Sequence, residues 1–237
     1  MAGRLEGRIA LVTGASRGIG RAVALAMAAE GAHIIALART TGALEELDDE
    51  IDSKGGAATL VPMDLKDFDA IDRLGAAIME RWQHLDILVA NAGVLGTLTP
   101  IPHLMPKTWQ SAVDINLTAN YRLIRSLDPL LRVASAGRAI FVTSHAASVN
   151  RPYWGAYAIT KAALEKMVLI YAEEVKASPL KVNLIDPGPT RTAMRHQAMP
   201  GEDPSTVKPP EALTGLFLEL ASPECTKHGE LVVYKAV

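Results

Sequence analysis

Short apolar runs alternate along the chain with longer segments of helical spacing. The runs are rich in leucine and β-branched residues and cover residues 9–12, 34–38, 59–63, 87–90, 139–143 and 182–185. Runs without polar alternation are typical of strands that are buried on both faces. Between them, apolar residues recur at helical intervals over about residues 20–30, 42–54, 69–82, 107–134 and 157–177. This alternation predicts an α/β fold, a doubly wound parallel sheet with crossover helices on both faces.

Glycine and proline positions set the limits of these elements. Gly31 follows the first predicted helix and Gly55 the second, where a left-handed residue commonly ends a helix. Prolines crowd residues 187–210, so this stretch is expected to hold no long regular element. A last helix near 211–221 and a strand near 231–234 would complete seven strands. We therefore expect residues 1–237 to form one domain, with a lid loop at about residues 189–209.

A glycine-rich turn follows the first strand and leads into the first helix. It reads Thr13-Gly14-Ala15-Ser16-Arg17-Gly18-Ile19-Gly20. Such a turn brings peptide N–H groups and the positive end of a helix to one spot, which favours a dinucleotide pyrophosphate. The same residues contain Gly14-x-Ser16-x-Gly18, the pattern of a hydrolase nucleophile elbow, although no earlier strand could supply the oxyanion hole. A tight turn without a ligand is the third interpretation.

The end of the second strand bears on which nucleotide binds. A carboxylate about 20 residues beyond the glycines suits a free ribose 2′-hydroxyl, whereas arginine suits a 2′-phosphate. That strand ends in Arg39, and no acidic residue follows before Glu45. With Arg17 on the same side, two guanidinium groups could clamp a phosphate dianion. This predicts NADP in preference to NAD; the alternative is that both arginines lie on a solvated rim.

The candidate chemistry gathers where the predicted strands end. Tyr157 and Lys161 are four residues apart in a helix and so share one face. A nearby positive charge lowers the pKa of a phenol and suits it to acid–base catalysis. Ser144 follows the fifth strand, and Asn91-Ala92-Gly93 and Asp64 follow the fourth and third. Parallel strands bring these carboxyl ends to one edge, where ligands of open sheets bind, although Ser144 alone could be a loop cap.

Composition and charge exclude several other classes of function. The 24 basic and 26 acidic residues are interspersed, which disfavours nucleic acid or a lipid surface as a partner. The single cysteine, Cys225, cannot form an intrachain disulfide, and the first residues lack the apolar stretch of an export signal. We therefore expect a cytoplasmic protein, and we assign no metal-binding residues.

Together these motifs resemble the short-chain dehydrogenase/reductase superfamily over nearly the whole chain. The matching residues are Thr13-Gly14-x-x-x-Gly18-Ile19-Gly20, Asp64-Leu65, Asn91-Ala92-Gly93, Asn116, Ser144, Tyr157-x-x-x-Lys161 and Pro187-Gly188 leading to Thr192. The resemblance implies a Rossmann-type sheet in the order 3-2-1-4-5-6-7. It also implies hydride transfer between a nicotinamide and a carbonyl or hydroxyl carbon.

Roles for individual residues also come from the resemblance. Tyr157 would donate a proton to the carbonyl oxygen, which Ser144 would hold. Lys161 would lower the pKa of the tyrosine and bind the nicotinamide ribose, while Asn116 would hold a relay water. Cofactor contacts would come from the glycine turn and the strand ends: Gly14, Ser16, Arg17, Gly18, Ile19, Gly20, Arg39, Asp64, Leu65, Asn91, Ala92, Gly93, Pro187, Gly188, Thr190 and Thr192.

The sequence of the lid loop indicates a class of substrate. Its Thr-Arg-Thr-x-Met-Arg run, from Thr190 to Arg195, resembles a bacterial subgroup described as similar to 3-oxoacyl-acyl-carrier-protein reductases. The expected activity is NADPH-dependent reduction of a 3-oxoacyl thioester or another ketone, and the expected partner is a small carbonyl or alcohol substrate. Arg191, Arg195 and His196 could attract an anionic group. The family resemblance also implies a homodimer or homotetramer, paired through the helices near 107–134 and 157–177. The alternative is a non-catalytic NADP-binding sensor or scaffold.

Overall fold

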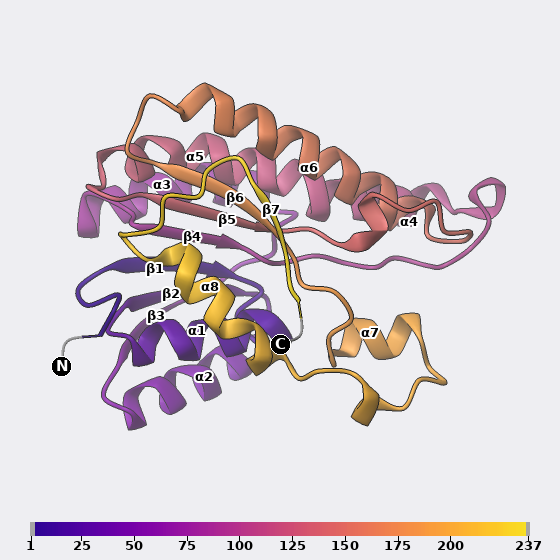
Figure 1. Cartoon of the computed structure of the whole chain (residues 1–237), viewed down its shortest axis with the longest axis horizontal. Helices are drawn as coiled ribbons and strands as arrows, with labels where there is room; N and C mark the ends of the chain where they lie inside the picture. Colours follow the sequence, from indigo (N-terminus) through magenta and orange to yellow (C-terminus); the bar gives the residue numbers. More distant parts are fainter. Residues whose placement is uncertain (1–2, 236–237) are drawn as a thin grey trace.

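Seven parallel strands form one twisted sheet in a computed structural model that describes residues 3–235 (Figure 1). The strands are β1 (Ile9–Thr13), β2 (His33–Ala38), β3 (Ala57–Pro62), β4 (Ile87–Ala90), β5 (Arg138–Val142), β6 (Lys181–Asp186) and β7 (Leu231–Val233). Their order is β3-β2-β1-β4-β5-β6-β7, which confirms the predicted topology. Strands β2 and β3 lie on one side of β1, and β4 to β7 lie on the other. Because the strand order reverses between β1 and β4, a crevice opens at the carboxyl ends of these two strands.

Helices cover both faces of the sheet. They are α1 (Gly18–Ala29), α2 (Thr41–Ser53), α3 (Phe68–Trp82), α4 (Pro106–Val113), α5 (Ala119–Val133), α6 (Gly155–Val175), α7 (Ala193–Ala198) and α8 (Thr214–Ala221). Helices α3, α5 and α6 lie on one face and α1, α2 and α8 on the other, while α4 and α7 extend beyond the sheet at the same end (Figure 1). Within β1, Leu11 packs toward the first layer and Val12 toward the second, because successive side chains point to opposite faces.

The predicted helix over 107–134 is interrupted. Helix α4 ends at Val113, a π-helical turn covers Asp114–Thr118, and α5 begins at Ala119. The wider turn adds a residue to the helical path and holds Asn116, which is fully buried. A periodic apolar pattern continues through such a turn, so the interruption was not predicted.

The lid is as irregular as the prolines predicted. It contains the short helix α7 and the 3-10 turn Pro204–Thr206, and a second 3-10 turn, Pro210–Leu213, follows it directly. The second of these turns replaces the first part of the helix expected from residue 211. Tyr157 is the third residue of α6 rather than its first, because the helix begins at Gly155.

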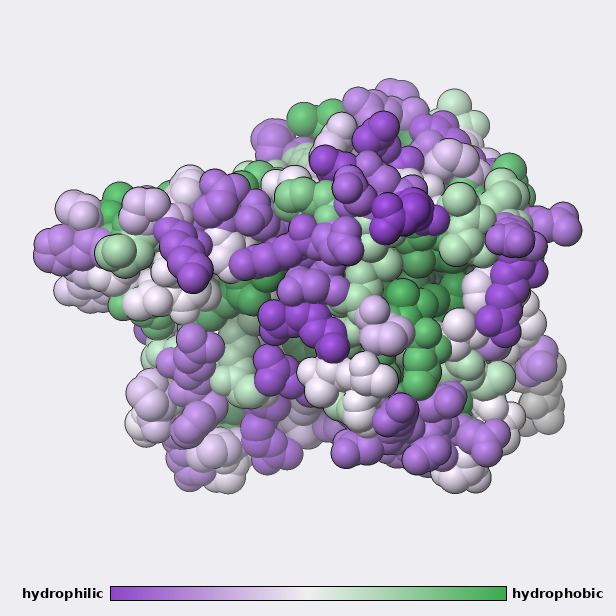
Figure 2. Space-filling model, turned by 180° about the vertical axis from the view of Figure 1, so that it is seen from behind, coloured by the Kyte–Doolittle hydropathy of each residue, from purple (hydrophilic) through white to green (hydrophobic). Residues whose placement is uncertain are grey.

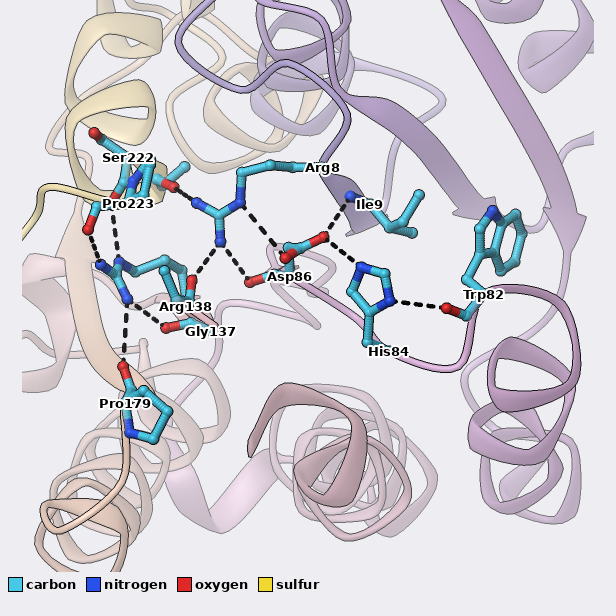
Figure 3. Close-up of polar contacts among 12 residues, drawn as sticks. Arg8, Ile9, Trp82, His84, Asp86, Gly137, Arg138, Pro179, Ser222 and Pro223 are labelled. Atoms are coloured by element: carbon cyan, nitrogen blue, oxygen red, sulfur yellow. Dashed lines mark hydrogen bonds and ion pairs between the residues drawn. The ribbon is translucent and has the colours of Figure 1, made fainter. Parts of the chain in front are cut away.

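Buried charged side chains close the amino-terminal edge of the sheet (Figure 3). Arg8 donates to the carbonyl oxygen of Ala221 at 2.6 Å, and a carboxylate oxygen of Asp86 accepts from the N–H of Ile9 at 2.9 Å. Arg138 donates to the carbonyl oxygen of Pro223 at 2.7 Å. These contacts join the end of α8 to three strands at the edge opposite the crevice. No helix among residues 3–235 is long and apolar enough to cross a membrane.

Candidate active site

A cavity of about 1360 Å³ opens at the carboxyl edge of the sheet. Figure 2 shows the molecule hollowed beneath its projecting lobe, with apolar surface facing the hollow and hydrophilic residues around it. Nearly all of the predicted site residues line the cavity: Gly14, Ser16, Arg17, Gly18, Ile19, Arg39, Asp64, Leu65, Asn91, Ala92, Gly93, Ser144, Tyr157, Lys161, Pro187, Gly188, Thr190 and Thr192. The two exceptions, Gly20 and Asn116, lie directly behind its wall.

The glycine turn has the backbone geometry that its sequence predicted. Gly14 and Gly18 have φ angles of 68° and 57°, which favour glycine because a side chain is strained there. A Cβ atom at Gly20 would lie 2.3 Å from the carbonyl oxygen of Gly14. Helix α1 therefore begins against the turn, with its N-terminal peptide groups beside the cavity. Among the described residues no histidine hydrogen-bonds Ser16, so the hydrolase interpretation finds no base there.

Asn91 fixes the turn to the next strand end. Its side-chain amide donates to the carbonyl oxygen of Thr13 at 3.0 Å, and its backbone N–H donates to the Thr13 hydroxyl, also at 3.0 Å. The N–H of Ala92 donates to the same hydroxyl at 3.0 Å. Thr13 is nearly fully buried, so these bonds are shielded from water. They hold the ends of β1 and β4 together at the point where the strand order reverses.

Asn116 lies behind the cavity wall and forms hydrogen bonds with residues of two neighbouring segments. Its side-chain oxygen accepts from the N–H of Val94 at 2.8 Å, and its amide donates to the carbonyl oxygen of Val94 at 2.9 Å. The same amide donates to the hydroxyl of Thr160 at 3.0 Å. The π-helical turn thus connects the loop after β4 to the residue that precedes Lys161. The carbonyl oxygen of Asn116 accepts from the side chain of Asn120 at 2.9 Å.

Lys161 is buried, with 3% of its surface exposed. Its Nζ donates to the carbonyl oxygen of Val142, the last residue of β5, at 2.7 Å. Burial lowers the pKa of Lys161 to about 8, against the opposing effect of the Glu165 charge. Nζ lies 5.9 Å from the centre of the Tyr157 ring. Phenol and ammonium therefore share one face of α6, as their spacing predicted.

The surroundings of Tyr157 differ from the expectation. Burial of the ring raises the pKa of Tyr157; hydrogen bonding with Ser144 lowers this pKa, and the charge of Asp186 raises it. The pKa of Tyr157 is therefore raised and not lowered as predicted, and the group that lowers it is Ser144 rather than Lys161. A phenol with a raised pKa stays protonated at neutral pH, which is the form that donates a proton. Ser144 also accepts from the N–H of Ala146 at 3.2 Å, so it is a loop cap as well.

Arg17 and Arg39 line one end of the cavity, beside the glycine turn and the end of β2. Both side chains are exposed, and neither has an ion-pair partner within the described part of the chain. Asp64 and Leu65 follow β3 at the same end, and the Asp64 carboxylate accepts from the N–H of Lys66 at 3.0 Å. Two unpaired guanidinium groups on one rim are suited to an anion such as a phosphate.

The lid reaches across the cavity. In α7, Gln197 donates to the carbonyl oxygen of Gly96 in the loop after β4, at 3.2 Å. Arg195 forms an ion pair with Glu202, with Nε 2.6 Å from Oε2. Arg195 is therefore already paired with Glu202, so an anionic group would compete with this carboxylate for it. Arg191 and His196 line the cavity as expected.

A buried acidic residue of the cavity, Asp186, was not predicted from the sequence. Asp186 ends β6 directly before Pro187-Gly188, and its carboxylate accepts from the N–H of Gly188 at 2.9 Å. An acidic residue at the carboxyl end of an apolar strand is a visible signal in the sequence, because ligands of open parallel sheets bind at that edge. His145, which is mostly exposed, lies with Nδ1 4.0 Å from this carboxylate.

The cavity fits a dinucleotide. Its volume exceeds the 300–1,000 Å³ that is common for small ligands, and it extends from Arg39 to Lys161. At Gly14 a Cβ atom would lie 3.1 Å from the backbone of Ala92, and at Gly18 it would lie 3.3 Å from the side chain of Thr192. The absence of side chains at these glycines keeps the backbone accessible to a pyrophosphate.

Comparison with known proteins gives a consistent set of relatives. Residues 8–203 match the short chain dehydrogenase family. The oxidoreductase YciK of Escherichia coli is 37% identical over 219 residues, which cover 91% of this chain and 86% of that protein. A 3-oxoacyl-[acyl-carrier-protein] reductase of Synechocystis is 32% identical over 191 residues, covering 80% of this chain and 77% of that protein.

Solved structures extend the likeness to the whole chain. A short chain dehydrogenase from Shigella flexneri complexed with NADP is 36% identical, with a TM-score of 0.94 and coverage of 98% of this chain and 99% of that one. One from Escherichia coli complexed with NADPH is also 36% identical, with a TM-score of 0.92 and coverage of 98% of both chains. The chain therefore belongs to the short-chain dehydrogenase/reductase superfamily of NAD(P)-dependent oxidoreductases.

Proposed function

We propose that this enzyme transfers hydride between NADPH and a ketone, or between NADP⁺ and the corresponding secondary alcohol. The observation that carries the proposal is the buried pair of Tyr157 and Lys161, which faces one cavity together with Ser144. A protonated phenol next to a hydroxyl can bind and protonate a carbonyl oxygen. Relatives solved with NADP and NADPH support the choice of cofactor.

The proposed roles follow from the positions of the side chains. Tyr157 donates the proton to the carbonyl oxygen, and Ser144 donates a hydrogen bond to the same oxygen. Lys161, fixed on the carbonyl of Val142, binds the ribose next to the nicotinamide and holds positive charge near the phenol. Asn116 orders the backbone behind Lys161, and the family resemblance adds the role of holding a relay water.

The cofactor is proposed to lie along the carboxyl edge of the sheet. The glycine turn would bind the pyrophosphate, Asp64 and Leu65 would flank the adenine, and residues 187–192 would line the nicotinamide. When bound, the nicotinamide supplies or accepts the hydride. The exposed Arg17 and Arg39 favour a 2′-phosphate and therefore NADP over NAD.

The substrate is proposed to be a 3-oxoacyl thioester or another ketone of medium size. An apolar cluster of Leu95, Ala146 and Tyr157 forms the wall beside the phenol, and Trp154 and Met194 pack against it. Such a wall suits an acyl chain, and methionine adapts to different chains. The Synechocystis relative is named for the reduction of 3-oxoacyl groups, which supports this substrate class.

The test is oxidation of NADPH and NADH, followed by nicotinamide absorbance, with acetoacetyl thioester, diketones, aromatic ketones and sugar-derived ketones. We expect turnover with NADPH, and Tyr157→Phe should reduce kcat by at least about 100-fold. The affinity of this variant for NADPH should remain within about twofold of the wild-type value. Tyr153→Phe is the matched control, since Tyr153 is exposed and does not line the cavity. A biological effect of the protein that persists unchanged in Tyr157→Phe would favour the non-catalytic sensor instead.

We further propose that residues 1–237 form one domain with its lid at residues 189–209, and that the protein acts in the cytoplasm as a homodimer or homotetramer. Large apolar side chains are exposed on α5 and α6, namely Tyr121, Val133, Ile159 and Ile170. Exposed apolar faces of this kind are typical of subunit contacts. Light scattering of a Tyr121→Glu variant tests this pairing, which predicts a lower molar mass for the variant than for the wild type.

A further inference from the structure

Asp186 is a buried acidic residue inside the proposed reaction site. It is the last residue of β6 and is only 5% exposed. It lines the same cavity as Ser144, Tyr157 and Lys161. None of the roles proposed above uses its carboxylate. A buried carboxylate costs free energy unless it is paired, so its partners matter.

The side chain of Asp186 has a fixed orientation, but positive groups nearby balance its negative charge only in part. One oxygen accepts from the N–H of Gly188 at 2.9 Å, which fixes the orientation of the side chain. The other lies 4.0 Å from Nδ1 of His145, a side chain that is 71% exposed. Within residues 3–235 no lysine or arginine nitrogen lies within 4 Å of either oxygen. Lys208 is close enough to interact with the Asp186 charge, but its Nζ donates to the carbonyl of Pro189 at 2.6 Å.

The other buried charge of the cavity has its own counter-charge. Lys161 donates to the carbonyl of Val142, and its charge is favoured by Glu165, which lies one helical turn further along α6. Glu165 accepts from the hydroxyl of Thr143 at 2.7 Å and does not line the cavity. Asp186 is thus the negative charge that faces the inner cavity without a fixed cation of its own.

We propose that Asp186 makes this site bind the oxidised, positively charged nicotinamide ring more tightly than the reduced, neutral ring. The inference rests on the proposed function, in which the segment beginning at Pro187 lines the nicotinamide. The two redox forms of the cofactor share their adenine, riboses and phosphates and differ in the charge of the ring. A fixed carboxylate in a poorly hydrated cavity therefore acts on that difference, since Coulomb attraction is weakly screened there.

The test measures binding rather than turnover. Dissociation constants for NADP⁺ and NADPH are determined by titration calorimetry at about pH 8, where histidine side chains are ordinarily neutral. In Asp186→Asn the amide oxygen can still accept from Gly188, so the variant removes the charge and keeps the turn. We expect its Kd for NADP⁺ to rise about tenfold, or about 1.4 kcal/mol, and its Kd for NADPH to stay within about twofold.

Two further variants make the result decisive. Asp64→Asn removes a carboxylate at the adenine end, so it should change both dissociation constants by the same factor and leave their ratio unaltered. Asp186→Ser, which also removes the charge and can accept from Gly188, replaces Asp186→Asn if that variant does not fold. A ratio of the two constants that is equal in wild type and in the Asp186 variant would overturn the inference. Failure of the wild-type chain to bind either form would overturn the proposed function instead.

Discussion

Lys161 donates a hydrogen bond from Nζ to the carbonyl oxygen of Val142 at 2.7 Å, which ties α6 to the end of β5. The contact is buried, and it directs the ammonium toward the cavity that Tyr157 also faces. Burial disfavours the charged form of Lys161 and lowers its pKa to about 8. Holding the ammonium in this place is therefore unfavourable for folding. The fold therefore carries a cost at the position where the proposed chemistry needs a cation.

This cost gives the first prediction, for Lys161→Met. The pKa of Lys161 is 10.5 in the unfolded chain and about 8 in the folded one, so the unfolded state holds the proton more tightly. Below about pH 8 the penalty is fully present; it disappears as the pH rises toward 10.5. Relative to the Met variant, the wild type should gain roughly 3 kcal/mol over this range. Urea denaturation of both proteins at the two ends of the pH range measures the gain. A difference in unfolding free energy between wild type and variant that is the same at both pH values would contradict the prediction.

The second prediction concerns the contact between Gly20 and the turn. In Gly20→Ala the new methyl group would lie 2.3 Å from the carbonyl oxygen of Gly14, and a backbone atom cannot move aside cheaply. We expect a loss of about 1–3 kcal/mol in stability from overpacking and a weaker affinity for NADPH. Calorimetric titration with NADPH and urea denaturation measure the two effects.

Gly42→Ala is the matched control for this substitution. Gly42 lies in α2 and is exposed, and a methyl group added there would meet no atom within 4 Å. Alanine should therefore stabilise the helix by about 0.5–1 kcal/mol. Equal effects at the two positions would show that the close approach at Gly20 is unimportant.

The third prediction concerns the choice of cofactor. Arg39→Asp replaces a charge-assisted donor with a carboxylate that repels a phosphate and can accept from a ribose hydroxyl. The ratio of kcat/KM for NADPH to that for NADH should fall at least about tenfold, since hydrogen bonds to charged groups contribute about 1.5–3 kcal/mol. Arg73→Asp, at an exposed position of α3 outside the cavity, should leave the ratio unchanged. An unaltered ratio in Arg39→Asp would remove the basis for the NADP preference.

Much of the fold could be predicted because the sheet is buried on both faces. Residues such as Leu11 and Val12 pack into different layers yet both need apolar side chains, so each strand reads as an uninterrupted run. The site residues that follow strands could be predicted for the same reason. Once the strands are parallel, their carboxyl ends meet at one edge, and Asn91 and Ser144 face one cavity there.

Features that depend on contacts between elements could not be predicted in this way. The π-helical turn around Asn116 keeps the apolar periodicity of a helix, so its sequence looks uninterrupted. Arg195 and Glu202 pair across a turn of the lid, at a spacing that no regular element predicts. Burial is the largest influence on the pKa of Tyr157, and the extent of burial depends on residues from several elements that cover the ring.

The last prediction concerns the opposite edge of the sheet, where Arg138 is 3% exposed (Figure 3). Its guanidinium donates to the carbonyl oxygens of Ser222, Pro223 and Cys225 at 3.0, 2.7 and 3.1 Å. These carbonyls belong to the segment that follows α8, and their hydrogen bonds to Arg138 are partly buried. Arg138→Met keeps the length and apolar stem of the side chain and leaves the carbonyls unsatisfied.

We expect Arg138→Met to lower the free energy of unfolding by about 2–4 kcal/mol, because it removes several partly buried hydrogen bonds to a charged group, and such bonds contribute about 1.5–3 kcal/mol each. Arg73→Met, at an exposed position, should change it by less than about 0.5 kcal/mol. The affinity for NADPH of the folded fraction should be unaffected, since Arg138 begins β5 at the edge away from the cavity. Urea denaturation together with calorimetric titration separates the two effects. A fall in cofactor affinity without a loss of stability would show that the two edges of the sheet are coupled.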